Sequence, residues 1–72
     1  MTTLAVSARN QIPATVVAVS KGEAIANVEL DAGGTRLVAS VTLEAVRDLG
    51  ITEGSTVTAV IKASDVMLGV AG

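Results

Sequence analysis

The chain has 72 residues, of which half are apolar and 17% are charged, and its formal net charge is −2. It contains no cysteine, histidine or aromatic residue, which excludes disulfide frameworks and the common zinc sites and removes the stacking platforms that single-stranded nucleic acids use. No apolar run approaches the ~18 residues of a membrane span, and the N-terminus lacks the pattern of a signal peptide, so we expect a cytoplasmic protein that binds neither nucleic acid nor membrane.

The apolar content is high for so short a chain. A domain of this size buries only about 60% of the surface that its unfolded form exposes, so its own core gives marginal stability. Disulfides and a structural zinc are excluded here, so association between copies is the remaining common source of additional stability. We therefore expect one domain over residues 1–72, assembled as an oligomer that buries its excess apolar surface at subunit interfaces.

The first half of the chain predicts three strands. Residues 11–20 are rich in β-branched side chains and end at a turn, and Pro13 places its part of this strand at the start or at an edge. Residues 23–32 alternate apolar and polar side chains, which is typical of a half-buried strand. Gly33 and Gly34 form the expected hairpin turn, and the alternation continues over residues 35–41.

The second half predicts one short helix and two more strands. Thr42 can cap a helix over residues 43–49, and Gly50 suits the left-handed residue that ends it. After a turn at residues 52–55, we expect strands over residues 56–64 and 65–70. This order predicts an all-β fold: a small five-stranded antiparallel barrel with one short helix, of the oligonucleotide/oligosaccharide-binding (OB) type.

Catalysis is not indicated. The commonest general base, histidine, and the strongest nucleophile, cysteine, are both absent. The seven acidic residues lie on polar strand faces, on the exposed side of the short helix or in turns, and no spacing pairs two of them. We therefore expect no enzyme activity, no resident cofactor and no metal site.

Oxyanion binding needs only hydroxyls, backbone N–H groups and a few cations. Four short segments offer these groups, and each also has an ordinary structural reading. Residues 7–9 could be a loose terminus, residues 19–22 a turn, residues 41–45 a helix cap, and residues 62–64 a strand end with a solubilising lysine. Taken singly, no segment is specific.

Taken together, three motifs resemble a known family. "SARNQI" at residues 7–12, "LGITEG" at residues 49–54 and "VTAVIKASDVML" at residues 57–68 are similar to the Mop domain of bacterial molbindins, an OB-like domain of the TOBE type. The resemblance implies a non-catalytic hexamer, a trimer of dimers, that binds molybdate at subunit interfaces for intracellular storage and homeostasis. The alternative is a ligand-sensing or oligomerisation module of a molybdate transport ATPase or a transcription regulator.

The resemblance also implies which residues bind the oxyanion. Ser7 with Arg9 would form one half of a site, and Thr42 with the Lys62 segment would form the other half from a neighbouring subunit. Where some relatives have a serine, this chain has Ala45, which could offer only its backbone N–H. The implied molybdate-binding set is Ser7, Arg9, Thr42, Lys62, Ala63 and Ser64, and the candidates for a second class of site are Asn10, Val19, Ser20 and Lys21. The residues do not distinguish molybdate from tungstate.

Overall fold

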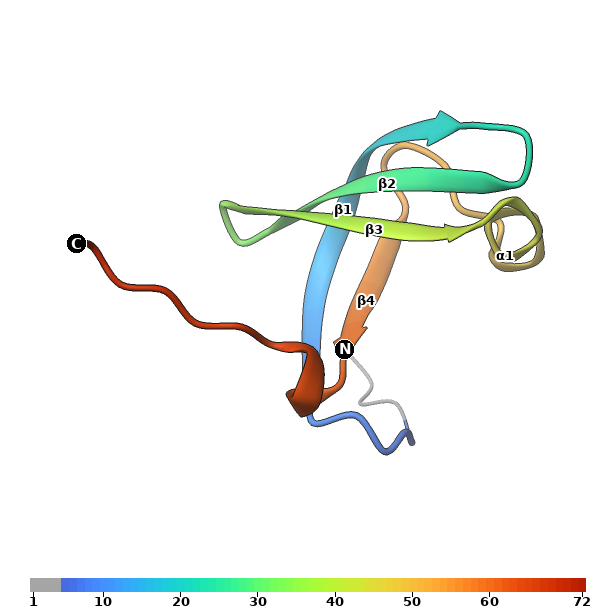
Figure 1. Cartoon of the computed structure of the whole chain (residues 1–72). Coiled ribbons are helices and arrows are strands. Elements are labelled where there is room, and N and C mark those ends of the chain that lie inside the picture. Colours follow the sequence, from blue (N-terminus) through green and yellow to red (C-terminus); the bar gives the residue numbers. More distant parts are fainter. Residues whose placement is uncertain (1–4) are drawn as a thin grey trace.

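The computed structural model describes residues 5–72. Four strands form one antiparallel sheet in the order β3-β2-β1-β4 (Figure 1). A short helix, α1, joins β3 to β4, and a turn of 3-10 helix, η1, follows β4. The elements are β1 (Asn10–Lys21), β2 (Ile25–Ala32), β3 (Thr35–Thr42), α1 (Leu43–Leu49), β4 (Thr56–Ile61) and η1 (Ala63–Asp65).

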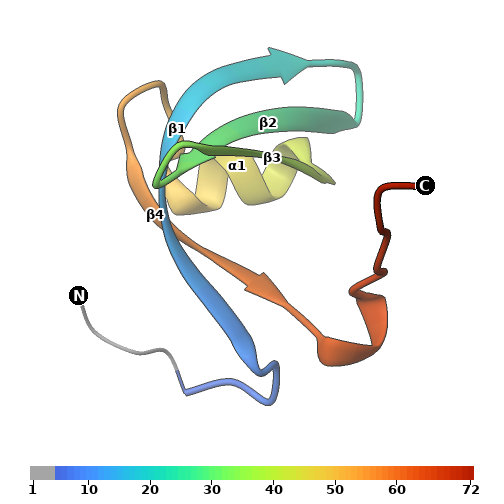
Figure 2. The same ribbon diagram turned by 90° about the vertical axis from the view of Figure 1, so that its left-hand side faces the viewer.

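Strand β1 pairs with two neighbouring strands, one along each half of its length. Its first half, from Asn10 to Thr15, pairs with β4, and its second half, from Thr15 to Lys21, pairs with β2. The β1–β2 register shifts between Val16 and Ala18, which is the mark of a bulge, and bulges bend and twist the strand that carries them. The strand is accordingly curved along its length (Figure 2). Pro13 lies in the half that has only β4 beside it, as its missing N–H requires.

The core lies on the inner face of this curved sheet. The alternation expected in the second strand is confirmed, because Ala26, Val28 and Leu30 of β2 are all buried. They pack with Val16 of β1 and with Val46 of α1 in one cluster. The helix therefore sits against the sheet through a single buried side chain.

The two expected turn signals in the middle of the chain are also confirmed. Gly33 and Gly34 join β2 to β3 with φ angles of 61° and 95°, which side chains with a Cβ rarely adopt. Gly50 ends α1 with φ 63° and ψ 38°, and its N–H donates to the carbonyls of Val46 and Arg47. These glycines thus shape the connection from β2 to β3 and the end of α1 before β4.

The expectation of a fifth strand is wrong for the single chain. The fourth predicted strand ends at Ile61, and η1 occupies Ala63–Asp65. Residues 66–72 have no regular secondary structure and are exposed. A strand needs a hydrogen-bonding edge, and the segment after η1 extends away from the strands (Figure 1). The barrel consequently stays open between β3 and β4.

Candidate functional site

The pairing of β1 with β4 brings the two most distinctive motifs to one end of the sheet. Asn10, the first residue of β1, is opposite Ile61, the last residue of β4, and its side-chain Nδ2 donates to the Ile61 carbonyl at 3.1 Å. The segments that extend beyond this pair are residues 7–9 on one side and residues 62–64 on the other (Figure 2). Segments more than fifty positions apart in the sequence are therefore neighbours in space.

The side chains at this end are suited to an anion. Ala8 is buried, whereas its neighbours Ser7 and Arg9 are exposed, so the serine and the arginine point away from the core. Lys62 and Ser64 are exposed as well. Among residues 5–72 neither cation is engaged in an ion pair, because the ion pair of this part of the chain joins Arg36 to Glu29. Two cations and two hydroxyls thus face solvent at one end of the sheet.

Backbone donors add to these side chains. Asp65 and Val66 donate their N–H groups to the carbonyls of Lys62 and Ala63, closing the turn of η1. The N–H groups at the start of such a turn have no partner within it. For Ala63 and Ser64 no partner occurs elsewhere in residues 5–72 either. Ala63 can therefore contribute to an anion site through its backbone alone.

Asp65 is a site-proximal residue that the sequence interpretation left out. It is exposed and follows Ser64 directly within η1. Its carboxylate reduces the combined charge of Arg9, Lys62 and Asp65 to a single positive charge per chain. Its position next to the "KAS" motif could have indicated a place at the site. The turn of η1 shows that Asp65 stays at the Arg9–Lys62 end of the sheet.

Thr42 is not at the Arg9–Lys62 end: it is the last residue of β3 and caps the start of α1. Its Oγ1 accepts the N–H of Ala45 at 3.0 Å, and the Leu43 N–H donates to the Ala24 carbonyl at 2.8 Å. Of the donors at the start of α1, the Glu44 N–H is left. Ala45 therefore already uses the backbone N–H that the resemblance offered to the ligand.

The second group of candidates lies near Thr42. Lys21, at the end of β1, is opposite Ala26, and Thr42 is opposite Ile25, which precedes Ala26 in β2. Val19 and Ser20 precede Lys21 in the same part of β1. This end of the sheet thus gathers Val19, Ser20, Lys21 and Thr42.

One chain does not unite the two groups. Asn10 and Lys21 lie at opposite ends of β1, and the 11 steps between them correspond to roughly 36 Å of strand contour. Thr42 therefore does not share one half-site with Lys62 within a chain. Asn10, assigned from the sequence to the second group, is found with the first.

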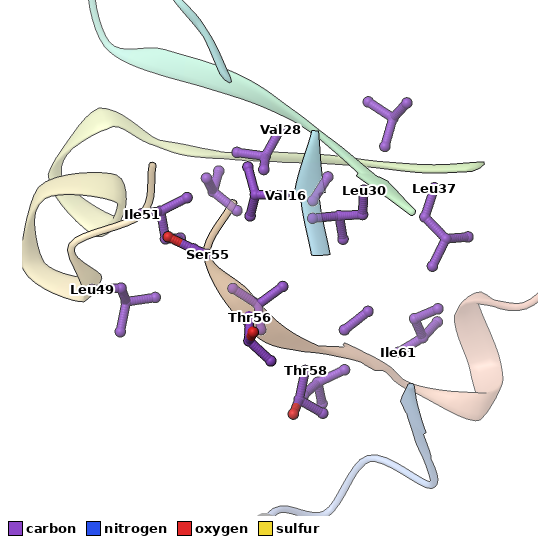
Figure 3. A pocket seen from close by; sticks show the side chains of 16 residues that line it. Val16, Val28, Leu30, Leu37, Leu49, Ile51, Ser55, Thr56, Thr58 and Ile61 are labelled. Carbon is purple, nitrogen blue, oxygen red and sulfur yellow. The ribbon is translucent and has the colours of Figure 1, made fainter. Parts of the chain in front are cut away.

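An apolar groove is the other marked feature of the molecule. It has a volume of about 710 Å³ and opens between β3 and β4. Figure 3 shows side chains from β3, β4 and the segment after α1 around it, among them Leu37, Ile51 and Ile61. Within residues 5–72 no three acidic, histidine or cysteine side chains come together as metal ligands, and no helix there is long and apolar enough to cross a membrane.

Comparison with known proteins places this geometry in a family. The model of the TOBE domain matches residues 6–68. Molybdenum-pterin-binding protein 3 of Clostridium pasteurianum is 47% identical over 66 residues, which cover 90% of this chain and 97% of that protein.

Two solved structures have a similar fold. A molybdate-binding protein from Sporomusa ovata superposes with a TM-score of 0.87 at 38% identity, covering 90% of this chain and 97% of that one. The cytoplasmic molybdate-binding protein ModG, with molybdate bound, gives a TM-score of 0.80 at 43% identity, covering 83% of this chain and 43% of that one. The chain therefore belongs to the TOBE-domain family, among the small molybdenum-pterin-binding (Mop) proteins.

Proposed function

We propose that this protein binds molybdate in the cytoplasm and stores it, without catalysis, in an oligomer whose binding sites lie between subunits. The observation that carries the proposal is the convergence of Ser7, Arg9 and Lys62–Ser64 at one end of the sheet, with both cations unpaired. The ligand is inferred from similar proteins: two of the solved structures are described as molybdate-binding proteins, and a relative is described as a molybdenum-pterin-binding protein.

Charge is the reason to place the site between subunits. Molybdate carries two negative charges, whereas the Arg9–Lys62 end retains one positive charge once Asp65 is counted. Two such ends from neighbouring copies would balance the dianion. Alternatively, one copy would bring the Thr42 end to the Arg9 end of another, adding hydrogen-bond donors from Lys21 and the Glu44 N–H but no net charge, because the Glu44 carboxylate offsets Lys21. Either arrangement needs a second chain.

The available contacts are sufficient for tight binding. Hydrogen bonds to a charged partner contribute about 1.5–3 kcal/mol each, and this end offers two cations, two hydroxyls and two backbone N–H groups. Even after the cost of ordering the segments, a few such bonds are consistent with dissociation constants of about 1 μM or below. Tungstate, with the same charge, is expected to compete.

Isothermal titration calorimetry with molybdate, on protein whose assembly is followed by native mass spectrometry, tests the proposal. We expect Arg9→Ala and Lys62→Ala each to weaken molybdate binding at least about tenfold, the loss of one charge-assisted bond, while the oligomer persists. Arg47→Ala, which removes an exposed cation of α1, is the matched control and should bind as the unchanged protein does. Full affinity in both site variants would refute the assignment.

Sulfate separates specific binding from general anion attraction. It carries the same charge but is smaller, so a site built for molybdate should bind sulfate more weakly. Equal heats with the two anions would mean that this end of the sheet attracts dianions without selecting molybdate. No heat with either anion, on a folded oligomer, would leave a purely structural oligomerisation domain.

A further inference from the structure

Asp65 is a hydrogen-bond acceptor among donors. The rest of the Arg9–Lys62 end offers two cations, two serine hydroxyls and the backbone N–H groups at the start of η1, all of which can donate to an anion. An ionised carboxylate has no hydrogen to donate and can only accept. Within residues 5–72 the Asp65 carboxylate accepts no hydrogen bond and forms no ion pair with either cation. Its acceptor positions are therefore available to a ligand.

The geometry of η1 places this carboxylate beside the donors. Lys62 immediately precedes η1, and Asp65 is the last residue of that turn. Side chains three residues apart in a 3-10 helix lie one above the other, and an acidic side chain at the third position of a helical turn can reach back toward its start. The N–H of Asp65 donates to the Lys62 carbonyl at 2.9 Å and closes this turn. An anion held by Lys62 and the N–H groups of η1 therefore lies next to the Asp65 carboxylate.

Tetrahedral oxyanions of the same charge differ in whether they carry a proton. Molybdate and sulfate are fully deprotonated dianions near neutral pH, so all their oxygens are acceptors and the Asp65 carboxylate only repels them. Phosphate and arsenate become dianions while they keep one O–H group, which can donate to a carboxylate. A hydrogen bond from an O–H group to an ionised oxygen is about twice as strong as one between neutral groups. One carboxylate thus lowers the affinity for the first class of anion and raises it for the second.

We propose that Asp65 is a specificity-determining residue that lets the Arg9–Lys62 end bind singly protonated oxyanions, namely hydrogen phosphate and hydrogen arsenate. The cations, the hydroxyls and the N–H groups of η1 hold the unprotonated oxygens, and the Asp65 carboxylate accepts the O–H group. This inference rests on the anion site proposed above and adds a second class of ligand to it. Hydrogen phosphate consequently competes with molybdate more effectively than sulfate does, although sulfate carries the same charge.

Isothermal titration of the full chain with two matched pairs of anions tests the proposal. Hydrogen phosphate is compared with sulfate, and hydrogen arsenate with selenate, which form a larger pair. The pH is kept above the second ionisation of phosphate and arsenate and the ionic strength is held constant, so that all four anions are dianions and two of them carry a proton. We expect the protonated member of each pair to bind at least about fivefold more tightly. Equal or tighter binding of sulfate and selenate would overturn the proposal.

Substitutions at Asp65 separate its carboxylate from other causes of a preference. Asp65→Ala removes both the repulsion and the acceptor, so sulfate should bind more tightly and hydrogen phosphate should lose its advantage. Asp65→Asn keeps the shape of the side chain and a neutral acceptor, and its preference for hydrogen phosphate should be intermediate. A preference that persists unchanged in Asp65→Ala would show that another group accepts the proton and would remove Asp65 from this role.

Glu53→Gln is the matched control. Glu53 is exposed in the turn before β4, whereas Lys62 follows the other end of that strand. The substitution removes the same charge from the chain and should leave the ratio of the two dissociation constants unchanged; a loss of preference equal to that in Asp65→Ala would reduce the effect to net charge. Circular dichroism and native mass spectrometry establish that each variant is folded and assembled.

Molybdate titration of the unchanged protein separates this inference from the proposed function. An Asp65-dependent preference for hydrogen phosphate over sulfate, without molybdate binding, would overturn the function alone. Molybdate binding with no preference between hydrogen phosphate and sulfate would overturn the role of Asp65 alone.

Discussion

Asp65 is the residue that most sharply defines the charge at the Arg9–Lys62 end. Without it, two cations would balance a dianion in one chain. With it, directly after Ser64 in η1, the end retains one positive charge. An acidic residue beside an anion site weakens binding through repulsion, and the interaction is screened by salt because the groups are exposed.

Asp65→Asn should therefore strengthen molybdate binding. Exposed charge pairs contribute up to about 1 kcal/mol, so we expect a two- to fivefold gain in affinity at low salt that shrinks as salt is added. Asp48→Asn, which removes an exposed carboxylate of α1, should change affinity much less. Equal gains in both variants would indicate a general effect of net charge and would remove Asp65 from the site.

The hydrogen-bond partner of Asn10 could not be predicted from the sequence pattern. The "SARN" motif placed Ser7, Arg9 and Asn10 together in the sequence, but the interpretation assigned Asn10 to the second group of candidates. Its amide in fact donates to the Ile61 carbonyl and holds β1 against β4. A motif identifies residue types at a site, whereas the partner of each side chain depends on strand pairing across more than fifty positions.

At the scale of elements, α1 depends on its ends. Seven residues are too few for a helix to be stable alone, so caps and packing must hold it. Thr42 provides the cap at one end through the Ala45 N–H, and Gly50 provides the other. Both were predictable because capping is local: the residue type, its position and the hydrogen bond lie within one turn.

Thr42→Ala should lower the free energy of unfolding by about 1 kcal/mol, the usual value of an N-cap hydrogen bond, as measured by urea denaturation. Thr42→Ser keeps an oxygen acceptor and should restore most of the stability. If Thr42 also binds the oxyanion, Thr42→Ala will weaken molybdate binding at temperatures where the variant is fully folded. A variant as stable as the unchanged protein would contradict the capping role.

Strands were predictable in their faces but not in their partners. The alternation of residues 23–32 correctly identified Ala26, Val28 and Leu30 as core. The strand expected over residues 65–70 is not formed by the single chain. Alternation reports that a segment has an apolar face, and only an available sheet edge turns that face into a strand.

The whole molecule has too small a core for its apolar content. The buried side chains among residues 5–72 are seven, three of them alanine: Ala8, Ala14, Val16, Ala26, Val28, Leu30 and Val46. Large apolar side chains such as Ile25, Val38 and Leu49 remain at least half exposed. In the proposed assembly, a fold with so little interior would gain much of its stability from association, so unfolding and dissociation are expected to be coupled.

This coupling predicts that the melting temperature depends on protein concentration. Mass action favours the assembled state by about 1.4 kcal/mol for each tenfold increase in concentration, which for a domain of this size corresponds to a shift of a few °C. Differential scanning calorimetry over a hundredfold concentration range should show this rise, and saturating molybdate should raise the melting temperature further. Leu68→Asp places a charge on one of the most exposed apolar side chains of residues 5–72; if that side chain is buried between copies, the dependence should flatten and the melting temperature should fall. A concentration-independent transition in the unchanged protein would mean that the small core suffices, and that its exposed apolar surface serves a purpose other than assembly.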